Sequence, residues 1–91
     1  MLWMDKSLDE RQSISRAALQ SAITLAVKRS NRECKDFVDV IVEYAKPNSR
    51  LDGNWAIRGV KFGKSDRQKA AQAIAVIVAR MQHEFALSET A

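Results

Sequence analysis

The chain has 91 residues, of which 46% are hydrophobic and 29% are charged, and this composition predicts one small folded domain over residues 1–91. Its one Cys and one His exclude an intrachain disulfide and a zinc site built from three or four nitrogen and sulfur ligands. The longest apolar run, 73–79, is far shorter than the roughly 20 residues of a membrane span, and residues 1–5 lack a signal-peptide core. We therefore expect a cytoplasmic protein with no cofactor, no metal and no membrane contact.

The positive charge of the chain is concentrated in one segment. The formal net charge is +4, and residues 1–45 contribute none of it because their basic and acidic groups balance. Within residues 46–69, Asp52 and Asp66 are outnumbered by a basic set: Lys46, Arg50, Arg58, Lys61, Lys64, Arg67 and Lys69. A local excess of this kind focuses positive potential on one surface. Two interpretations stay open, an anion-binding surface and a solvated face that keeps a small domain soluble.

A first helix is predicted over about residues 7–29. Ser7 and Glu10 have the spacing of a capping box, in which each side chain can bond the other residue's amide. Apolar residues then recur at helical spacing between positions 14 and 26. Lys28 and Arg29 close the segment with the charge that the helix dipole favours at a C-terminus.

A strand is predicted over residues 36–45. Six of the eight residues from Phe37 to Tyr44 are β-branched or aromatic, and such side chains fit a pleated surface better than a helix. The spacing of Phe37, Val40, Ile41 and Tyr44 also fits a helix, so that alternative stays open.

A second strand is predicted over residues 54–62, where the alternation of polar and apolar residues breaks once. A bulge at Gly59 restores the alternation, because one extra residue shifts every later side chain to the other face. With that bulge Arg58 and Lys61 face outward. Four apolar side chains then face the core: Trp55, Ile57, Val60 and Phe62.

A second helix is predicted over residues 66–86, with Ser65 as its N-cap and residues 87–91 as a frayed tail. The predicted fold class is α+β with the order α-β-β-α, an antiparallel hairpin covered on one face by two helices. A two-stranded sheet keeps two open edges, and edges invite pairing. The last helix also carries extra apolar residues at Ala71, Ala75 and Val76. Both features predict a homodimer.

The candidate reactive residues do not assemble into a known catalytic pattern. Residues 59–65 lie between a strand and a helix, but their two glycines are separated by three residues, where a P-loop needs four. A helix start beside Gly63, Lys64 and Arg67 suits an anion without that motif. His83 and Cys34 are interpreted as structural residues, since no nucleophile and base stand in a suitable arrangement. We expect no enzymatic activity.

Two resemblances accompany these observations. The runs 53–55 (Gly-Asn-Trp) and 59–64 (Gly-Val-Lys-Phe-Gly-Lys) resemble a pattern in small uncharacterised bacterial proteins, which implies no particular activity.

A second resemblance is to the double-stranded-RNA-binding domain. In that family a Gly-x-Ser turn leads into a helix whose first lysines hold phosphates, and residues 63–65 match the turn. Arg67 stands where the family has its second lysine, Asp66 replaces the first, and the family's third strand is missing. This resemblance implies phosphate contacts at Lys64, Arg67 and Lys69.

The sequence thus predicts a non-catalytic protein that acts by binding an unidentified protein partner, as a homodimer. The alternative is a nucleic-acid-binding protein that contacts phosphates through residues 58–69. The candidate contact residues for an anion or nucleic acid are Arg58, Lys61, Lys64, Arg67 and Lys69.

Overall fold

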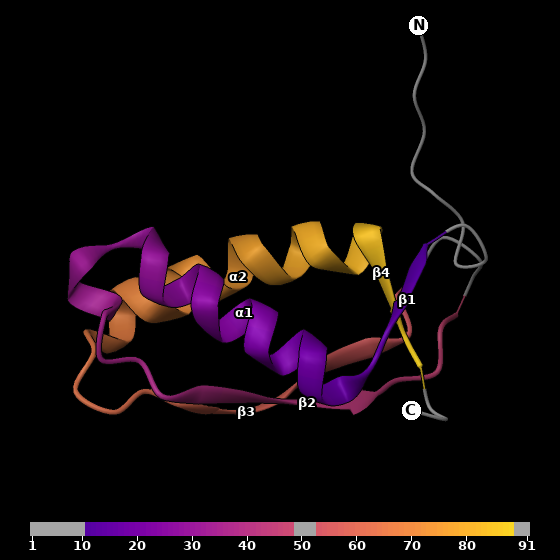
Figure 1. The fold of residues 1–91 in the computed structure, drawn as a ribbon, viewed down its shortest axis with the longest axis horizontal. Coiled ribbons are helices and arrows are strands. Elements are labelled where there is room, and N and C mark those ends of the chain that lie inside the picture. The colour runs from indigo at the N-terminus through magenta and orange to yellow at the C-terminus, as the bar shows by residue number, and fades with distance from the viewer. Residues whose placement is uncertain (1–10, 49–52, 89–91) are drawn as a thin grey trace, which may run out of the picture.

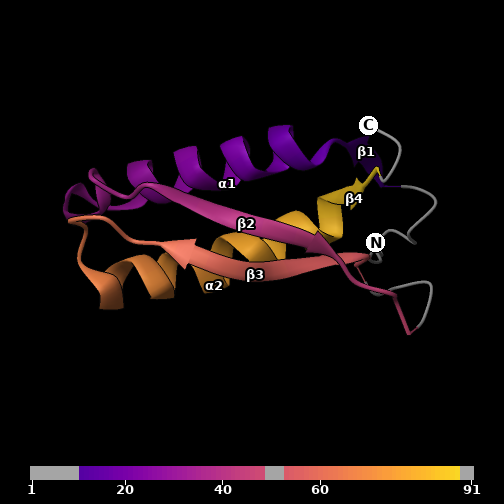
Figure 2. The same cartoon turned by 90° about the horizontal axis from the view of Figure 1, so that it is seen from below.

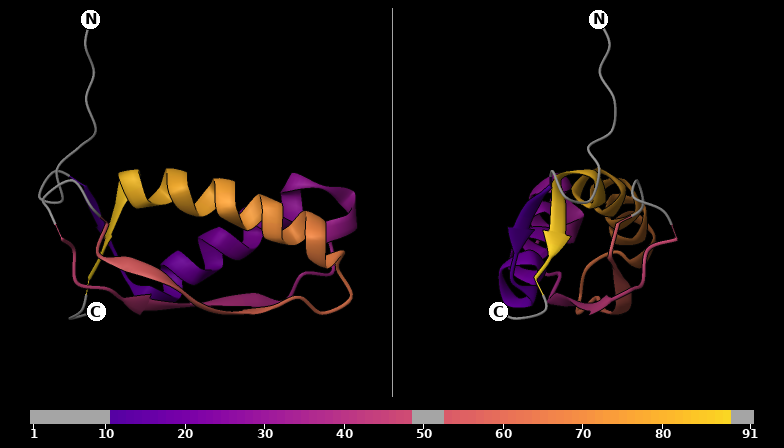
Figure 3. Two further views of the ribbon diagram at one scale, coloured as in Figure 1. Left: turned by 180° about the vertical axis from the view of Figure 1, so that it is seen from behind. Right: turned by 90° about the vertical axis from the view of Figure 1, so that its right-hand side faces the viewer.

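The computed structural model describes residues 11–48 and 53–88, and these form a mixed α+β fold of two helices and two small sheets (Figure 1). In chain order the elements are β1 (Gln12–Ile14), α1 (Arg16–Ser30), the 3-10 helix η2 (Arg32–Cys34), β2 (Asp39–Tyr44), β3 (Trp55–Lys61), α2 (Arg67–Glu84) and β4 (Phe85–Leu87). Strands β2 and β3 pair antiparallel, and β1 and β4 pair parallel. Both helices lie on the same side of the β2–β3 hairpin (Figure 3).

Helix α1 begins later than the sequence pattern predicts. It starts at Arg16, and Ser15 is its N-cap, with the side-chain oxygen accepting the amide of Ala18 at 3.2 Å. The expected start near residue 7 is wrong because residues 12–14 form β1; the Ser7 capping box itself lies outside the described residues. The helix buries one stripe, consisting of Leu19, Ile23 and Val27, against the rest of the fold.

The hairpin confirms that residues 39–44 are a strand, so the helical alternative is wrong. Ile41 pairs with Gly59 and Val42 with Ile57, which leaves Arg58 as the extra residue of a bulge. A bulge in this strand is therefore confirmed, but its extra residue is Arg58 and not the predicted Gly59, which pairs with Ile41. The side chain of Arg58 is exposed as expected. A Cβ added to Gly59 would meet Ile41 at 3.6 Å, an ordinary contact. The bulge does not depend on the glycine for space.

Helix α2 is capped by Asp66, whose carboxylate accepts the amide of Lys69 at 3.0 Å. The expected cap, Ser65, is wrong: it is buried and donates its hydroxyl to the carbonyl of Phe62 at 2.6 Å. The helix ends at Glu84, and the chain continues directly into β4 where a frayed tail was expected. The predicted order of four elements thus omitted β1 and β4, which lie side by side in Figure 1.

The core lies between the helices and the inner face of the hairpin. Its most completely buried side chains come from α1, η2, β2, β3 and the segment between η2 and β2. They are Trp55, Phe37, Leu19, Ile23, Val27, Val40, Val42 and Cys34. Ala70, Ile74, Ile77 and Met81 add the buried face of α2. In the part of the chain that the structure describes, neither helix has the length and hydrophobicity to cross a bilayer.

Candidate interaction surfaces

The run 53–55 holds the C-terminal strand in place. The side chain of Asn54 donates to the carbonyl of Leu87 at 3.0 Å and accepts the amide of the same residue at 2.8 Å. The indole of Trp55 donates to the carbonyl of Phe85 at 3.2 Å. These bonds satisfy main-chain groups of β4 that would otherwise be buried without partners. The Gly-Asn-Trp pattern therefore has a structural role in this fold.

The run 59–64 ends in a turn that only a glycine fits. Gly63 has a φ of 61°, and a Cβ there would lie 2.6 Å from Val38 Cγ2 and 2.7 Å from the carbonyl oxygen of Asp36. Beside it, Phe62 packs edge-to-face on the buried Phe37 with ring centroids 6.2 Å apart. This run too is explained by packing, and the turn sets where the chain enters α2.

The start of α2 is already engaged with the chain's own groups. Lys69 forms an ion pair with Glu33 of η2, and the amide of Asp66 donates to the carbonyl of Glu33 at 3.0 Å. The hydrogen bond and the charge of Glu33 raise the pKa of Lys69 above its usual value of 10.5. The carboxylate of Asp66 occupies the helix N-terminus, where an external anion would otherwise bind.

The five candidate basic residues are therefore not equivalent. The guanidinium of Arg67 lies over the ring of Phe62, with its central carbon 4.9 Å from the centroid, and Lys69 is paired with Glu33. Arg58, Lys61 and Lys64 are exposed, and no ion pair to them is found in residues 11–48 and 53–88. Arg58 and Lys61 belong to β3, and Lys64 belongs to the turn that follows. Of the five candidates, three are therefore exposed cations that are not engaged with another side chain in the described part of the chain: two on β3 and one in the turn after it.

Exposed hydrophobic side chains gather along β2, a feature that the sequence reasoning missed. Ile41 and Tyr44 of β2, Val38 just before it and Leu25 of α1 are all exposed, with Val38 at 52%. Alternation in the run 38–44 could have found Ile41, because it has the opposite parity to the buried Val40 and Val42. Val38 and Tyr44 share the parity of those buried residues, so the spacing in the sequence does not predict their exposure.

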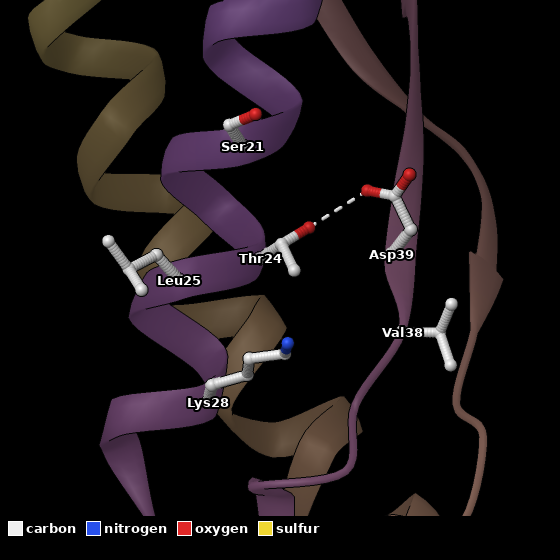
Figure 4. A pocket seen from close by; sticks show the side chains of 6 residues that line it. All are labelled: Ser21, Thr24, Leu25, Lys28, Val38 and Asp39. Atoms are coloured by element: carbon white, nitrogen blue, oxygen red, sulfur yellow. Dashed lines mark hydrogen bonds between the residues drawn. The ribbon is translucent and has the colours of Figure 1, made fainter.

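A hollow of about 420 Å³ lies between α1 and the start of β2 (Figure 4). Thr24 donates its hydroxyl to Asp39 at 2.9 Å across this hollow, and Leu25 and Val38 stand on either side of it. Lys28 of α1 also lines the hollow. Thr24 and Asp39 are bonded to each other, and the rest of the lining is mixed, with the polar Ser21 and Lys28 beside the apolar Leu25 and Val38.

The two residues with potential nucleophile or base chemistry lie apart from these surfaces. Cys34 is fully buried in η2, and His83 is exposed in the last turn of α2. Among the described residues no cluster of three or more His, Cys, Asp or Glu side chains is placed to hold a metal ion.

The chain matches no protein-family model, no curated protein and no solved structure.

Proposed function

We propose that this chain is a non-catalytic protein-binding module that works as a homodimer, with the hairpin facing a partner protein and α2 joining the two copies. The observation that carries the proposal is the exposure of three large hydrophobic side chains in and beside β2, those of Val38, Ile41 and Tyr44, with cations on the adjacent strand. Apolar anchors beside arginine are typical of protein interfaces, and large exposed apolar side chains that gather on one surface mark interaction sites.

The burial of the one thiol supports the non-catalytic part of the proposal. Because Cys34 is fully buried, its thiol is kept away from any substrate. In the hollow between α1 and β2, Thr24 and Asp39 are bonded to each other, and Asp39 also accepts the amide of Val40. Both bonds go to Oδ1 of Asp39, and the bond from Thr24 holds α1 against β2, so this carboxylate has a structural role.

Affinity purification from cells that naturally make the protein tests the partner surface. We expect a protein that co-purifies with the wild type to be lost with Val38→Asp combined with Ile41→Asp, because the two carboxylates would be buried against an apolar partner. The matched control is Ala17→Asp combined with Gln68→Asp, which adds the same charge at exposed first-turn helix positions. Equal recovery with both double variants would contradict a role for the exposed residues of β2.

Nucleic-acid binding is the second candidate function, and the exposure of Arg58, Lys61 and Lys64 favours it. Binding to duplex DNA would weaken with salt with a slope of about −0.9 per phosphate neutralised. Replacing Lys64 and Arg67 by Ala would then reduce the steepness of that slope by about two, because two phosphates would no longer be neutralised. Fluorescence anisotropy with labelled duplex DNA and duplex RNA measures this slope. No salt-dependent binding at low salt would remove this candidate.

A further inference from the structure

The two outer edges of the hairpin differ in whether their main-chain groups have hydrogen-bond partners. On β2, the amide of Val42 donates to the side-chain oxygen of Gln20 on α1 at 2.8 Å. The amide of Val40 donates to the carboxylate of Asp39 at 2.8 Å, and Thr24 of α1 holds that carboxylate (Figure 4). Helix α1 runs alongside this strand in Figure 2. These donors on the β2 edge therefore already have partners, which closes that part of the edge to another strand.

The edge of β3 has free groups in its middle. Since the amides of Val40 and Val42 point away from β3, their neighbours Val60 and Ile57 belong to non-hydrogen-bonded pairs. The N–H and C=O groups of Ile57 and Val60 therefore point away from β2, toward the outer edge. Within residues 11–48 and 53–88, no hydrogen bond to these groups is found.

The start of β3 is covered by α2. Gln82 donates its side-chain amide to the carbonyl of Trp55 at 2.8 Å. The stretch left open on this edge is therefore short, from Ile57 to Val60, with the bulge at Arg58 in its centre.

The charges on β3 select the kind of strand that can pair there. Its sequence from Trp55 to Lys61 contains two cations and no acid. A strand docked on this edge would lie about 4.8 Å away, so its side chains would be cross-strand neighbours of Arg58 and Lys61. Acidic neighbours are favoured there. A second copy of β3 would instead bring its own Arg58 and Lys61 to the same edge, where like charges oppose pairing.

We propose that the edge of β3 from Ile57 to Val60 binds an extended acidic segment of a partner protein, which adds a strand to the hairpin and sets its carboxylates beside Arg58 and Lys61. This inference rests on the proposed protein-binding function and names the mode of binding. Main-chain hydrogen bonds supply the affinity in such a complex, and the side chains supply the selectivity.

Two synthetic peptides test the proposal by nuclear magnetic resonance. The blocked peptide Thr-Glu-Val-Glu-Val-Glu-Thr is titrated into the labelled protein, and so is its counterpart with Lys in place of each Glu. We expect the Glu peptide to shift the amide signals from Ile57 to Lys61, with an affinity at least about tenfold above that of the Lys peptide. The Glu peptide methylated at alternate amide nitrogens should lose binding, because it keeps the charge but cannot donate to the strand.

Charge reversal on the protein gives the second arm. Arg58→Glu combined with Lys61→Glu should weaken the Glu peptide about tenfold and favour the Lys peptide. The matched control is Arg16→Glu combined with Arg29→Glu, which makes the same change in net charge at exposed positions of α1, the helix beside β2. This control should bind the Glu peptide as the wild type does.

In the nuclear magnetic resonance experiments, four results would overturn the proposal: no binding of the Glu peptide, signal shifts confined to β2, equal binding of the methylated peptide, or contacts between two copies of β3 in a mixed-label sample. The last result would assign the edge to a second copy of the chain. The affinity purification distinguishes failure of this inference from failure of the proposed function. A partner lost with Val38→Asp and Ile41→Asp but unaffected by Arg58→Glu and Lys61→Glu would leave that function standing and refute strand addition at β3.

Discussion

At the level of single residues, the turn between β3 and α2 depends on Gly63. Its φ of 61° lies in the left-handed region, and the space around its Cα is closed by Val38 and by the carbonyl of Asp36. Both effects act against any L side chain, since the left-handed conformation costs about 1–2 kcal/mol and the main-chain carbonyl cannot move without disturbing the turn.

Gly63→Ala is expected to lower the free energy of unfolding by about 2–4 kcal/mol. Gly59→Ala is the matched control, because its added Cβ makes an ordinary contact at 3.6 Å and its φ is not positive. The control should change stability by about 1 kcal/mol or less. Urea denaturation followed by circular dichroism measures both variants. Equal losses in the two would contradict the importance of this turn.

The ion pair between Lys69 and Glu33 predicts a dependence of stability on pH. Because Glu33 raises the pKa of Lys69 in the folded chain, the pair stabilises the fold below the unfolded value of 10.5 and is lost as the pH rises through the folded value. Glu33→Gln should therefore lower the pKa of Lys69. The stability difference between wild type and variant should disappear at pH values above that pKa.

The pKa of Lys69 can be followed through its side-chain carbon signals by nuclear magnetic resonance. Both groups are about half exposed, so added salt should shrink the stability difference as well. The matched control is Glu43→Gln, which removes an exposed carboxylate on β2. A pKa of Lys69 that is the same in all three proteins would refute the pairing.

At the level of elements, β4 is held by two side chains, those of Asn54 just before β3 and of Trp55 at its start. In the described part of the chain, the sheet partner of β4 is β1. Asn54→Ala should lower the free energy of unfolding by about 2–4 kcal/mol, because the amide and carbonyl of Leu87 would both lose their partner in a buried place. Gln72→Ala on the exposed face of α2 is the control and should be close to neutral. Thermal unfolding of both variants gives the comparison; a neutral Asn54→Ala would show that β4 does not need this contact.

The two hairpin edges should also differ in amide hydrogen exchange. The amides of Val40 and Val42 are bonded to side chains, whereas those of Ile57 and Val60 face the open edge, so the second pair should exchange faster. Gln20→Ala should accelerate exchange at Val42 and leave Val60 unchanged. Similar protection at all four amides in the wild type would contradict the assignment of the edges.

The elements that sequence reasoning located are those with a periodic pattern. The β-branched run 37–44 and the single break of alternation near Gly59 identified the hairpin and its bulge, because a period of two localises one extra residue. Strands β1 and β4 have three residues each and no pattern of their own, and they pair across almost the whole length of the chain. No local signal could place them.

The candidate site was predictable only in part, for a similar reason. The exposure of Arg58 and Lys61 follows from the parity of the strand, and it could be read from the sequence. The engagement of Lys69 depends on η2 reaching the start of α2, and the closure of the β2 edge depends on Gln20 of α1. Both are tertiary contacts, and the spacing of residues in the sequence does not predict them.

At the level of the whole molecule, α2 presents an apolar stripe to solvent. Val76 is 68% exposed, and Ala71, Ala75 and Ala79 are exposed beside it. Small residues along such a stripe allow a second helix to approach closely, which supports the proposed homodimer.

Light scattering over a dilution series should therefore give twice the 10.2 kDa mass of one chain at micromolar concentration. Val76→Glu should shift the protein to the monomer mass, since the carboxylate would be buried between two helices. Ile41→Glu, on the hairpin, is the control and should leave the dimer intact. A wild-type mass of 10.2 kDa at every concentration would refute the dimer.

The parallel pairing of β1 and β4 also determines how the fold responds to mechanical tension. Gln12 lies opposite Phe85 and Ile14 opposite Leu87, and the amide of Ser88 extends the pairing to the carbonyl of Ile14. A force that pulls residue 12 and residue 87 apart along the strands slides one strand past the other. All the hydrogen bonds of the pair then carry the force together instead of opening one after another. The hairpin and both helices lie between these two strands in the chain, so they are shielded from tension until that outermost pair ruptures.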